Sequence, residues 1–526
     1  MIKFMTAWMR ISPMLFVGTL LVLSRASETI EQVTIPHFYY YSSAEKAFIV
    51  EKADGREKYV LVSFELPVSS STQGIGGPGW SPSGQWFAWT TYDLEGGNSR
   101  QLIANVVKRE GGNPFSLINP RPRTTGYDVQ MKWSPVEDQL LVRYSYLDMN
   151  SAFVSDTFLY DPSTQKTTIL RFEGSDSASN RIEWSPDGQF IVFYQPDQTK
   201  LVMHLFGMNG RKYERHLKLE GSCGVEAVLP FWAPGTSKVA YEQFHNSVFV
   251  IEDIVSGYLV EFDMPDAVLR FVDWSPDGNH ALVYTASSCE AKSLQLGLLS
   301  LNDQTFTSLL QDATLPESYV MGRLDDWLNR YTLYPISGWS PSGDKAVIFS
   351  SDNDLYALAL SPYSLQKIPV PLIGKTNFVR WINNSDRCLF ERDPIEPQKQ
   401  AEIFSYDFQT RILDPFLESS ETDNISFLAL SPHGHFLAYS YLDGYLVDLT
   451  TGSTNRIEFM SSSLPEGGRI DEVIWHPSEG WLFILYQAPS MRLVNVVNSE
   501  GSIQRELTEC APTYACFGWM PDRVRR

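Results

Sequence analysis

The sequence predicts an all-β protein, a β-propeller of about ten four-stranded repeat units. Three observations predict this fold: a recurring Trp-Ser-Pro-Asp/Ser-Gly phrase, an apolar run rich in β-branched and aromatic residues after each copy, and frequent turn residues between copies. Clear copies begin at Trp80, Trp184, Trp274 and Trp339, and worn copies begin at Trp133, Trp232, Trp381, Leu430, Trp475 and Trp519. Their mean spacing of about 49 residues suits blades of four strands.

Each residue of the phrase has a mechanical explanation. Proline presets φ for the first central turn position, Asp or Ser bonds to the local backbone, and Gly tolerates positive φ where the chain enters the next strand. The Trp ends the innermost strand, where a large flat side chain fills the gap between neighbouring blades. We therefore interpret the repeated Trp and Pro residues as structural, because a functional site rarely needs ten copies.

The strands after each phrase recur at matching places. The second strand of the unit is the clearest, as in 87–89, 191–193 and 437–439, and the third recurs in 157–160 and 355–358. The stretches between copies lack the three and four spacing of apolar residues that solenoid helical repeats would show.

Ring closure is predicted from the two ends of the repeat region. The last copy supplies one innermost strand at 514–519, and 37–42, 47–52 and 58–64 are predicted as the second, third and fourth strands of the same blade. Pairing them removes two exposed sheet edges. Because rings of four to eight blades are common, two architectures stay open: one large ring, which we favour, and two smaller rings divided near 311–333.

The repeated phrase resembles the WD40-like (PD40) repeats of the TolB-like propeller family, in which Trp-Ser-Pro-Asp-Gly and an apolar strand mark each blade. The resemblance covers nearly all of residues 27–526. It implies a propeller that binds protein or peptide partners at the cell envelope. The chain departs from TolB in having ten copies instead of six blades and no α/β domain before the propeller.

The first 26 residues are predicted to be a signal peptide. Lys3 and Arg10 give a positive start, 14–23 form an apolar stretch, and Ser24-Arg25-Ala26 is a small-x-small cleavage pattern. Ten apolar residues are too few to span a bilayer comfortably. We expect an exported protein, periplasmic or extracellular, without membrane insertion of the mature chain; retention of the segment as an anchor is the alternative.

The chain is acidic, with a formal net charge of −20 at pH 7. Such a surface repels nucleic acid and anionic lipid, so nucleic acid is excluded as a partner. We favour the interpretation that this negative charge keeps the protein soluble. The alternative is that it forms an acidic site for cationic partners.

Export makes disulfides chemically accessible to the five cysteines. Cys510 and Cys516 flank a short loop and are predicted to form a disulfide bond that closes it. Cys223 and Cys289 lie in loops that emerge on the same face, so they are predicted to tie neighbouring blades. Cys388 lies in an apolar strand and is predicted to be a core thiol.

Catalytic motifs are absent: the sequence has no Gly-x-Ser-x-Gly, His-Glu-x-x-His, Cys-x-x-Cys, phosphate loop or regular calcium loop. We predict no catalytic residue, metal or cofactor. His433 and His435 are predicted as a turn residue and a solvated strand residue, in preference to a metal pair.

One segment departs from the repeat. Residues 315–333 are predicted to form a short amphipathic helix, because apolar side chains recur there at helical spacing. The favoured interpretation is that this helix caps a blade or seals a wide channel. The alternative is a docking element on the loop face. Its binding residues would be Trp327 and Tyr331, with Asp325 and Asp326 beside them.

Two main functions are consistent with these features. The first is an exported, non-enzymatic propeller scaffold that binds protein or peptide partners at the cell envelope. The second is a secreted glycan-active hydrolase or lyase whose carboxylates converge at the central channel from different blades. A purely structural envelope component is a third.

Overall fold

The computed structural model describes the strands and most of their tight turns. The described residues are 35–42, 44–64, 79–93, 101–117, 125–147, 153–170, 181–197, 200–218, 231–243, 248–262, 267–286, 294–313, 337–349, 354–369, 374–382, 385–394, 402–417, 426–441, 443–457, 469–488, 491–507 and 517–521. The chain divides into residues Met1–Ile35 and a compact unit, Pro36–Arg526, which contains all the strands.

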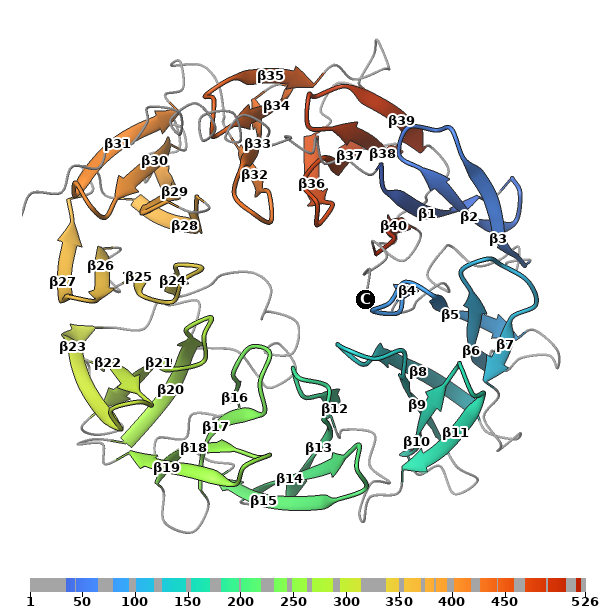
Figure 1. The fold of residues 1–526 in the computed structure, drawn as a ribbon, viewed down its shortest axis with the longest axis horizontal. Coiled ribbons are helices and arrows are strands. Elements are labelled where there is room, and N and C mark those ends of the chain that lie inside the picture. The colour runs from blue at the N-terminus through green and yellow to red at the C-terminus, as the bar shows by residue number, and fades with distance from the viewer. Residues whose placement is uncertain are drawn as a thin grey trace, which may run out of the picture. The chain divides into compact units, whose positions relative to one another are not determined.

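Ten four-stranded antiparallel sheets form the blades of one ring (Figure 1). Blades 1 to 3 contain β4 (Gly79–Trp80), β5 (Trp86–Asp93), β6 (Gln101–Lys108), β7 (Phe115–Leu117); β8 (Thr125–Trp133), β9 (Leu140–Leu147), β10 (Phe153–Asp161), β11 (Lys166–Leu170); and β12 (Arg181–Trp184), β13 (Phe190–Asp197), β14 (Lys200–Gly207), β15 (Lys212–Lys218). Blades 4 to 6 contain β16 (Phe231–Trp232), β17 (Lys238–Glu242), β18 (Phe249–Asp253), β19 (Tyr258–Phe262); β20 (Ala267–Trp274), β21 (His280–Ala286), β22 (Leu294–Ser300), β23 (Thr305–Ala313); and β24 (Ser337–Trp339), β25 (Lys345–Phe349), β26 (Leu355–Leu360), β27 (Tyr363–Ile368).

Blades 7 to 9 contain β28 (Gly374–Trp381), β29 (Arg387–Pro394), β30 (Glu402–Asp407), β31 (Ile412–Leu417); β32 (Ser426–Leu430), β33 (Phe436–Tyr441), β34 (Asp443–Asp448), β35 (Thr454–Ile457); and β36 (Arg469–Trp475), β37 (Trp481–Ala488), β38 (Met491–Asn498), β39 (Ile503–Leu507). Blade 10 contains β40 (Phe517–Trp519), β1 (His37–Ser42), β2 (Ala47–Lys52) and β3 (Lys58–Ser63). The described residues contain no helix, and the helix predicted at 315–333 lies outside them.

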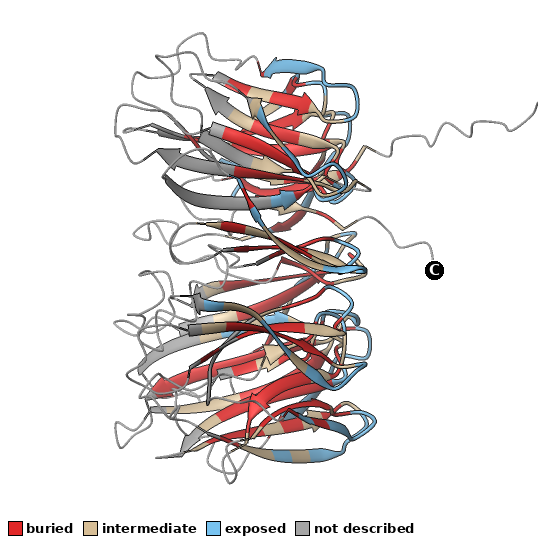
Figure 2. Cartoon of the chain, turned by 90° about the vertical axis from the view of Figure 1, so that its left-hand side faces the viewer, coloured by how far each residue is buried: buried red, intermediate tan, exposed pale blue. Residues whose placement is uncertain are grey.

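A single ring is confirmed, and the alternative of two smaller rings is wrong. Buried apolar clusters join each of the first eight blades to the next along the chain, and aromatic pairs join blade 9 to blade 10 and blade 10 to blade 1. The long interval before Trp339 is no boundary, because Leu282 and Leu298 of blade 5 pack in one cluster with Trp339 and Ile348 of blade 6. Buried residues accordingly run along the strands of the blades, and many of the turns at one edge are exposed (Figure 2).

The ring closes where the last strand pairs with the first. In the antiparallel register of β40 and β1, Trp519 lies opposite Phe38 and Gly518 lies opposite Tyr39. The Trp519 ring stacks on Phe483 of blade 9 with ring centroids 4.1 Å apart. On the other side, the Tyr39 ring lies 4.7 Å from Phe87 of blade 1. The predicted closure is therefore confirmed, and it buries aromatic surface on both sides of blade 10.

Hydrogen bonds from the repeated Trp residues join neighbouring blades. In five blades the indole N–H donates to the backbone carbonyl of the residue just before the Trp of the preceding blade. These bonds run from Trp133 to Gly79 (3.0 Å), Trp184 to Lys132 (3.2 Å), Trp274 to Phe231 (3.1 Å), Trp381 to Gly338 (2.8 Å) and Trp519 to Ile474 (3.2 Å). Trp232 instead donates to the Tyr194 hydroxyl of blade 3 at 3.1 Å. The Trp therefore fastens the innermost strands together in addition to filling the gap between blades.

Three repeated Trp residues are buried without a partner for the indole N–H: Trp80, Trp339 and Trp475. For Trp339 and Trp475, the expected acceptors would be the carbonyls of Asp273 and Ala429. Both residues lie at register shifts in their strands, between Phe271 and Asp273 in β20 and between Phe427 and Ala429 in β32. Because a β-bulge redirects the local backbone, it explains why these two indoles lack the acceptor that the other blades provide.

The difference between Trp381 and Trp475 gives a paired test of the indole hydrogen bond. Both rings are buried and each lies against a Phe ring, Phe408 or Phe436. Replacing either Trp by Phe removes similar volume, but only Trp381→Phe leaves a buried carbonyl without its donor. We expect Trp381→Phe to lower the free energy of unfolding by about 1 to 2 kcal/mol more than Trp475→Phe. Equal losses in chemical denaturation would show that the indole acts through its volume alone.

Candidate functional site

The two faces of the ring are built differently. Because strands alternate in direction, the connections from first to second strand and from third to fourth strand emerge on one face, which we call the turn face. Nine blades have a first-to-second connection, which contains five residues in eight of them, as in Ser81–Gln85, and six in blade 2; third-to-fourth connections contain two to six. Second-to-third and fourth-to-first connections emerge on the opposite face, the loop face. There the fourth-to-first connections range from four residues (263–266) to 23 (314–336).

In five blades the Ser of the phrase organises the turn that follows it. In blade 3 the backbone N–H of Phe190 donates to the Ser185 hydroxyl oxygen at 3.0 Å, and the Ser185 hydroxyl donates to the Asp187 carboxylate at 2.6 Å. The N–H of Gly188, whose φ is 69°, donates to the Ser185 carbonyl at 2.9 Å. The same Ser bond to the start of the second strand recurs in blades 1, 5, 6 and 8. The turn role that was predicted for the phrase is therefore confirmed.

A second repeated turn, between the third and fourth strands, was not predicted from the sequence. An Asp at the end of the third strand accepts backbone N–H bonds from the residues two and three positions later, and the residue four positions later has positive φ. The four copies begin at Asp161, Asp253, Asp407 and Asp448. The signal that could have found it is the spacing Asp-x-x-Ser/Thr followed by Gly, Gln or Arg.

These bonds change the acidity of the turn carboxyls. The Thr450 hydroxyl donates to Asp448 at 2.6 Å, and this bond, with the backbone N–H bonds, lowers the pKa of the Asp448 carboxyl. Burial acts against ionisation of Asp161 and Asp253, but hydrogen bonds from Ser and Thr outweigh it and lower the pKa of each carboxyl. Asp161, Asp253 and Asp448 are thus ionised structural acceptors.

Side chains of successive turns also bind one another around the turn face. Ser83 of blade 1 donates to Asp138 of blade 2, through its N–H at 3.2 Å and its hydroxyl at 2.5 Å. Lys238 of blade 4 donates to the carbonyl of Gly278 in blade 5 at 3.3 Å. Because these groups satisfy each other, they link blades and leave fewer polar atoms to bind a ligand.

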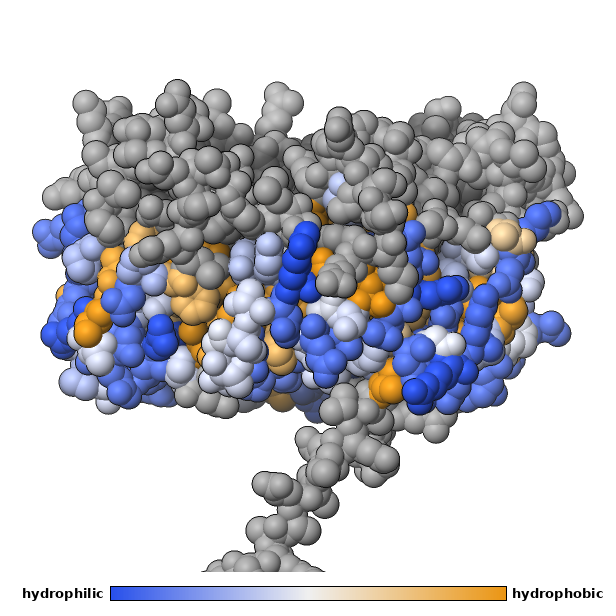
Figure 3. Space-filling view, turned by 90° about the horizontal axis from the view of Figure 1, so that it is seen from above, coloured by the Kyte–Doolittle hydropathy of each residue, from blue (hydrophilic) through white to orange (hydrophobic). Residues whose placement is uncertain are grey.

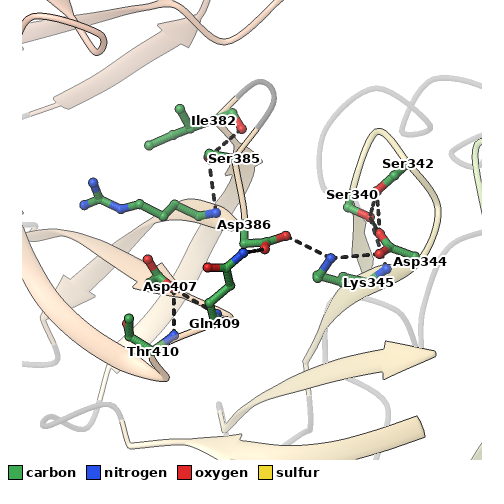
Figure 4. Close-up of polar contacts among 11 residues, drawn as sticks. Ser340, Ser342, Asp344, Lys345, Ile382, Ser385, Asp386, Asp407, Gln409 and Thr410 are labelled. Carbon is green, nitrogen blue, oxygen red and sulfur yellow. Dashed lines mark hydrogen bonds and ion pairs between the residues drawn. The ribbon is translucent and has the colours of Figure 1, made fainter. Parts of the chain in front are cut away.

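Blades 6 and 7 carry the largest of these polar groups (Figure 4). The Lys345 ammonium lies 2.8 Å from Asp344 of its own turn and 2.8 Å from Asp386 of the next blade. Gln409 donates to the other Asp386 oxygen at 2.6 Å. The bond from Lys345 is the main reason that the pKa of Asp386 is lowered, and burial only partly opposes it. A lysine held between two carboxylates is a charged link between blades, with no neutral amine to act as a base.

Blades 8 and 9 are linked by Glu479, whose side chain is 5% exposed. One carboxylate oxygen accepts the backbone N–H of His433, and the other lies 2.7 Å from Nδ1 of His435. Glu479 has a φ of 62°, at the turn position where Gly84, Gly188 and Gly278 stand in other blades. His433 is a turn residue, as predicted, whereas His435, predicted to be a solvated strand residue, lies in the same turn just before β33. No set of three or more metal-ligating side chains occurs in the described part of the chain.

In the described part of the chain, two blade interfaces contain a Tyr–Glu–Arg group whose Tyr and Glu are buried. Tyr241 donates to Glu252 at 2.7 Å, and Arg215 from the outer strand of the preceding blade binds the same carboxylate at 2.8 Å through Nε. Burial and the carboxylate together raise the pKa of the Tyr241 hydroxyl. Tyr40, Glu51 and Arg505 repeat the arrangement between blades 9 and 10. The repetition at matching strand positions marks both groups as links between blades.

The residues predicted to bind a partner all lie outside the described part of the chain. They are Trp327, Tyr331, Asp325 and Asp326 in the connection from β23 to β24. Cys223, Cys289, Cys510 and Cys516, predicted to form disulfides, also lie outside it. Cys388 is a buried free thiol, so the prediction of a core thiol is confirmed, and burial raises its pKa to about 12. No helix in the described residues is long and apolar enough to cross a membrane.

The outer wall offers separate apolar side chains (Figure 3). Exposed large apolar residues on the outer strands are Val60, Ile169, Tyr258, Leu259, Tyr363 and Ile412. They stand on different blades apart from the neighbours Tyr258 and Leu259, and single exposed apolar residues are ordinary features of protein surfaces.

Comparisons with known proteins found similar solved structures but no matching family. No family model and no curated protein matches it. A eukaryotic initiation factor structure matches with 12% identity over 93% of this chain and 99% of that chain, with a TM-score of 0.48. Dipeptidyl peptidase 4 of Porphyromonas gingivalis matches with 12% identity over 90% of this chain and 58% of that chain, with a TM-score of 0.39. TolB of Acinetobacter baumannii matches with 15% identity over 75% of this chain and 82% of that chain, with a TM-score of 0.27. At these identities the likeness concerns the fold alone.

The turn aspartates predict how stability depends on pH. Because folding lowers the pKa of Asp161, Asp253 and Asp448 below the ordinary value of 3.8, their stabilisation is complete above that pH and is lost as the pH falls through the folded-state values. We expect the free energy of unfolding to fall steeply below about pH 4. Thr450→Val should raise the pKa of Asp448 toward its ordinary value, as measured by carboxyl NMR titration.

Thr450→Ser is the matched control, because it keeps the hydroxyl donor and should leave the titration of Asp448 nearly unchanged. If Thr450→Val leaves the Asp448 titration where it is in the native protein, the hydroxyl does not stabilise the carboxylate and this account of the turn is wrong.

Proposed function

We propose that the chain is an exported, non-enzymatic propeller scaffold that binds protein or peptide partners at the cell envelope through its loop face. The observation that carries the proposal is the difference between the faces. The turn-face connections are short and nearly uniform, whereas the fourth-to-first connections of the loop face vary from four to 23 residues. Loops of varied length on a rigid scaffold are the usual place for binding residues.

The chemistry of the turn face supports the same choice. Its carboxylates and its Lys345 ammonium bind one another or the local backbone across blade interfaces. Binding a partner there would compete with bonds that hold the ring together. A partner that binds the loop face leaves those bonds intact.

The charge of the loop connections favours a neutral or cationic partner surface. Connections 219–230, 263–266, 418–425 and 458–468 contain Asp or Glu and no Lys or Arg. Opposite charge would steer a partner toward this face, and the association would weaken as salt is added. Export of the scaffold is supported by the leader pattern in residues 1–26.

The connection at 314–336 is the longest of the fourth-to-first connections and holds the predicted contact residues Trp327 and Tyr331. Replacing both by Ala should abolish capture of a partner from the membrane fraction of the source cells, because buried aromatic anchors supply much of the energy of an interface. Cross-linking and mass spectrometry of the native protein and the double variant measure this loss.

Tyr258→Ala/Tyr363→Ala is the matched control, because it removes two exposed aromatic rings from the outer wall and should leave capture unchanged. Equal capture by all three proteins contradicts a binding role for the insertion, and a large fall in melting temperature of Trp327→Ala/Tyr331→Ala supports the capping role instead. Release of sugar products from envelope glycans by the purified protein would contradict the scaffold and favour a hydrolase or lyase.

A further inference from the structure

Blade 8 differs from the other blades in how it is attached to the ring. Its phrase begins with Leu430 in place of Trp, so it offers no indole to blade 7. On its other side, the Trp475 indole N–H of blade 9 has no partner. Among the described residues, blade 8 is therefore the one blade without an indole hydrogen bond at either interface.

The interface with blade 7 is also small. Among the described residues, its cluster has three buried members, Leu389 from blade 7 and Leu437 and Val447 from blade 8, with five partly buried apolar residues packed against them. The cluster between blades 1 and 2, by comparison, buries Trp86 together with Tyr144 and Tyr146. Since stabilisation from apolar contacts scales with the area buried, blade 8 is held less firmly by blade 7 than blade 2 is by blade 1.

The interface with blade 9 contains a buried amide that lacks hydrogen bonds. Asn495 in β38 is 1% exposed, and neither its amide oxygen nor its amide nitrogen has a partner. Its neighbours two residues away on the same strand, Leu493 and Val497, pack in one cluster with Ala438 and Leu446 of blade 8. By the alternation of a strand, Asn495 faces blade 8 as well. When this interface opens, water can form hydrogen bonds with the Asn495 amide and with the Trp475 indole N–H. These new bonds lower the free energy that opening requires.

Glu479 is the polar contact that resists such opening. Its carboxylate is buried, and it accepts bonds from the backbone N–H of His433 and from the His435 ring, both on blade 8. Glu479 adopts positive φ where other blades have Gly, a conformation that costs free energy for a residue with a side chain. The strain is offset by a charged contact placed where the indole bonds are missing.

We propose that the ring opens locally at blade 8, and that the contacts of the Glu479 carboxylate hold blade 8 against blade 9 in the closed ring. Opening separates β32–β35 from their neighbours, breaks the two bonds of Glu479 and exposes Asn495 and the Trp475 indole to water. The rest of the ring stays joined by its indole hydrogen bonds and by the aromatic closure at blade 10.

Hydrogen exchange of the full chain, followed by mass spectrometry, tests this proposal. Peptides from β32–β35 should exchange faster than peptides from β8–β11 of blade 2, which has an indole bond at both interfaces. Glu479→Gln should speed exchange in blade 8 by on the order of tenfold and leave blade 2 unchanged. Asp138→Asn, the control, removes a comparable contact between blades 1 and 2, where the Trp133 bond remains, and should change exchange in blade 8 little.

Asn495→Leu tests the proposal in the opposite direction. It replaces a buried amide without partners by an apolar side chain of similar size and should slow exchange in blade 8, whether or not Glu479→Gln folds. The proposal is overturned if β32–β35 exchange no faster than β8–β11, if Glu479→Gln speeds exchange equally in all blades, or if Asn495→Leu leaves blade 8 unchanged.

Discussion

The ring depends on the contact between the innermost strands of neighbouring blades. There the indole of one Trp covers the preceding blade and, in five blades, donates to the carbonyl just before the Trp of that blade. This contact sets the position of each sheet relative to the sheet before it. Because the same contact recurs between successive blades, the blades together form a ring. The closing strand β40 completes it with the same kind of bond, from Trp519 to the carbonyl of Ile474.

Much of this architecture could be predicted from the sequence, because the repeated phrase specifies both the turn and the Trp that packs between neighbouring blades. The three N-terminal strands of blade 10 were predicted to within a residue, since turn residues bound them closely. The number of rings could not be settled, because the 65-residue spacing before Trp339 fits an insertion and a domain boundary equally well. Packing of Leu282 and Leu298 against Trp339 decides it.

The candidate site was less accessible to prediction. Asp448 and its equivalents escaped notice because their spacing is short and their residues are ordinary in loops. Glu479 escaped notice because its role depends on positive φ and on His433 and His435, which are distant in sequence. Such pairings arise only when two blades meet. The residues that were predicted for binding stand in a connection that the repeat does not constrain.

The most direct test of the ring is a cross-link between its two ends. Tyr40 and Phe517 lie opposite each other in the pairing of β1 and β40. The variant Tyr40→Cys/Phe517→Cys should form an intramolecular disulfide under mild oxidation, found as a linked peptide pair after digestion of the monomer. A disulfide that forms only between molecules, or none in a folded monomer, would contradict a ring closed by its first and last strands.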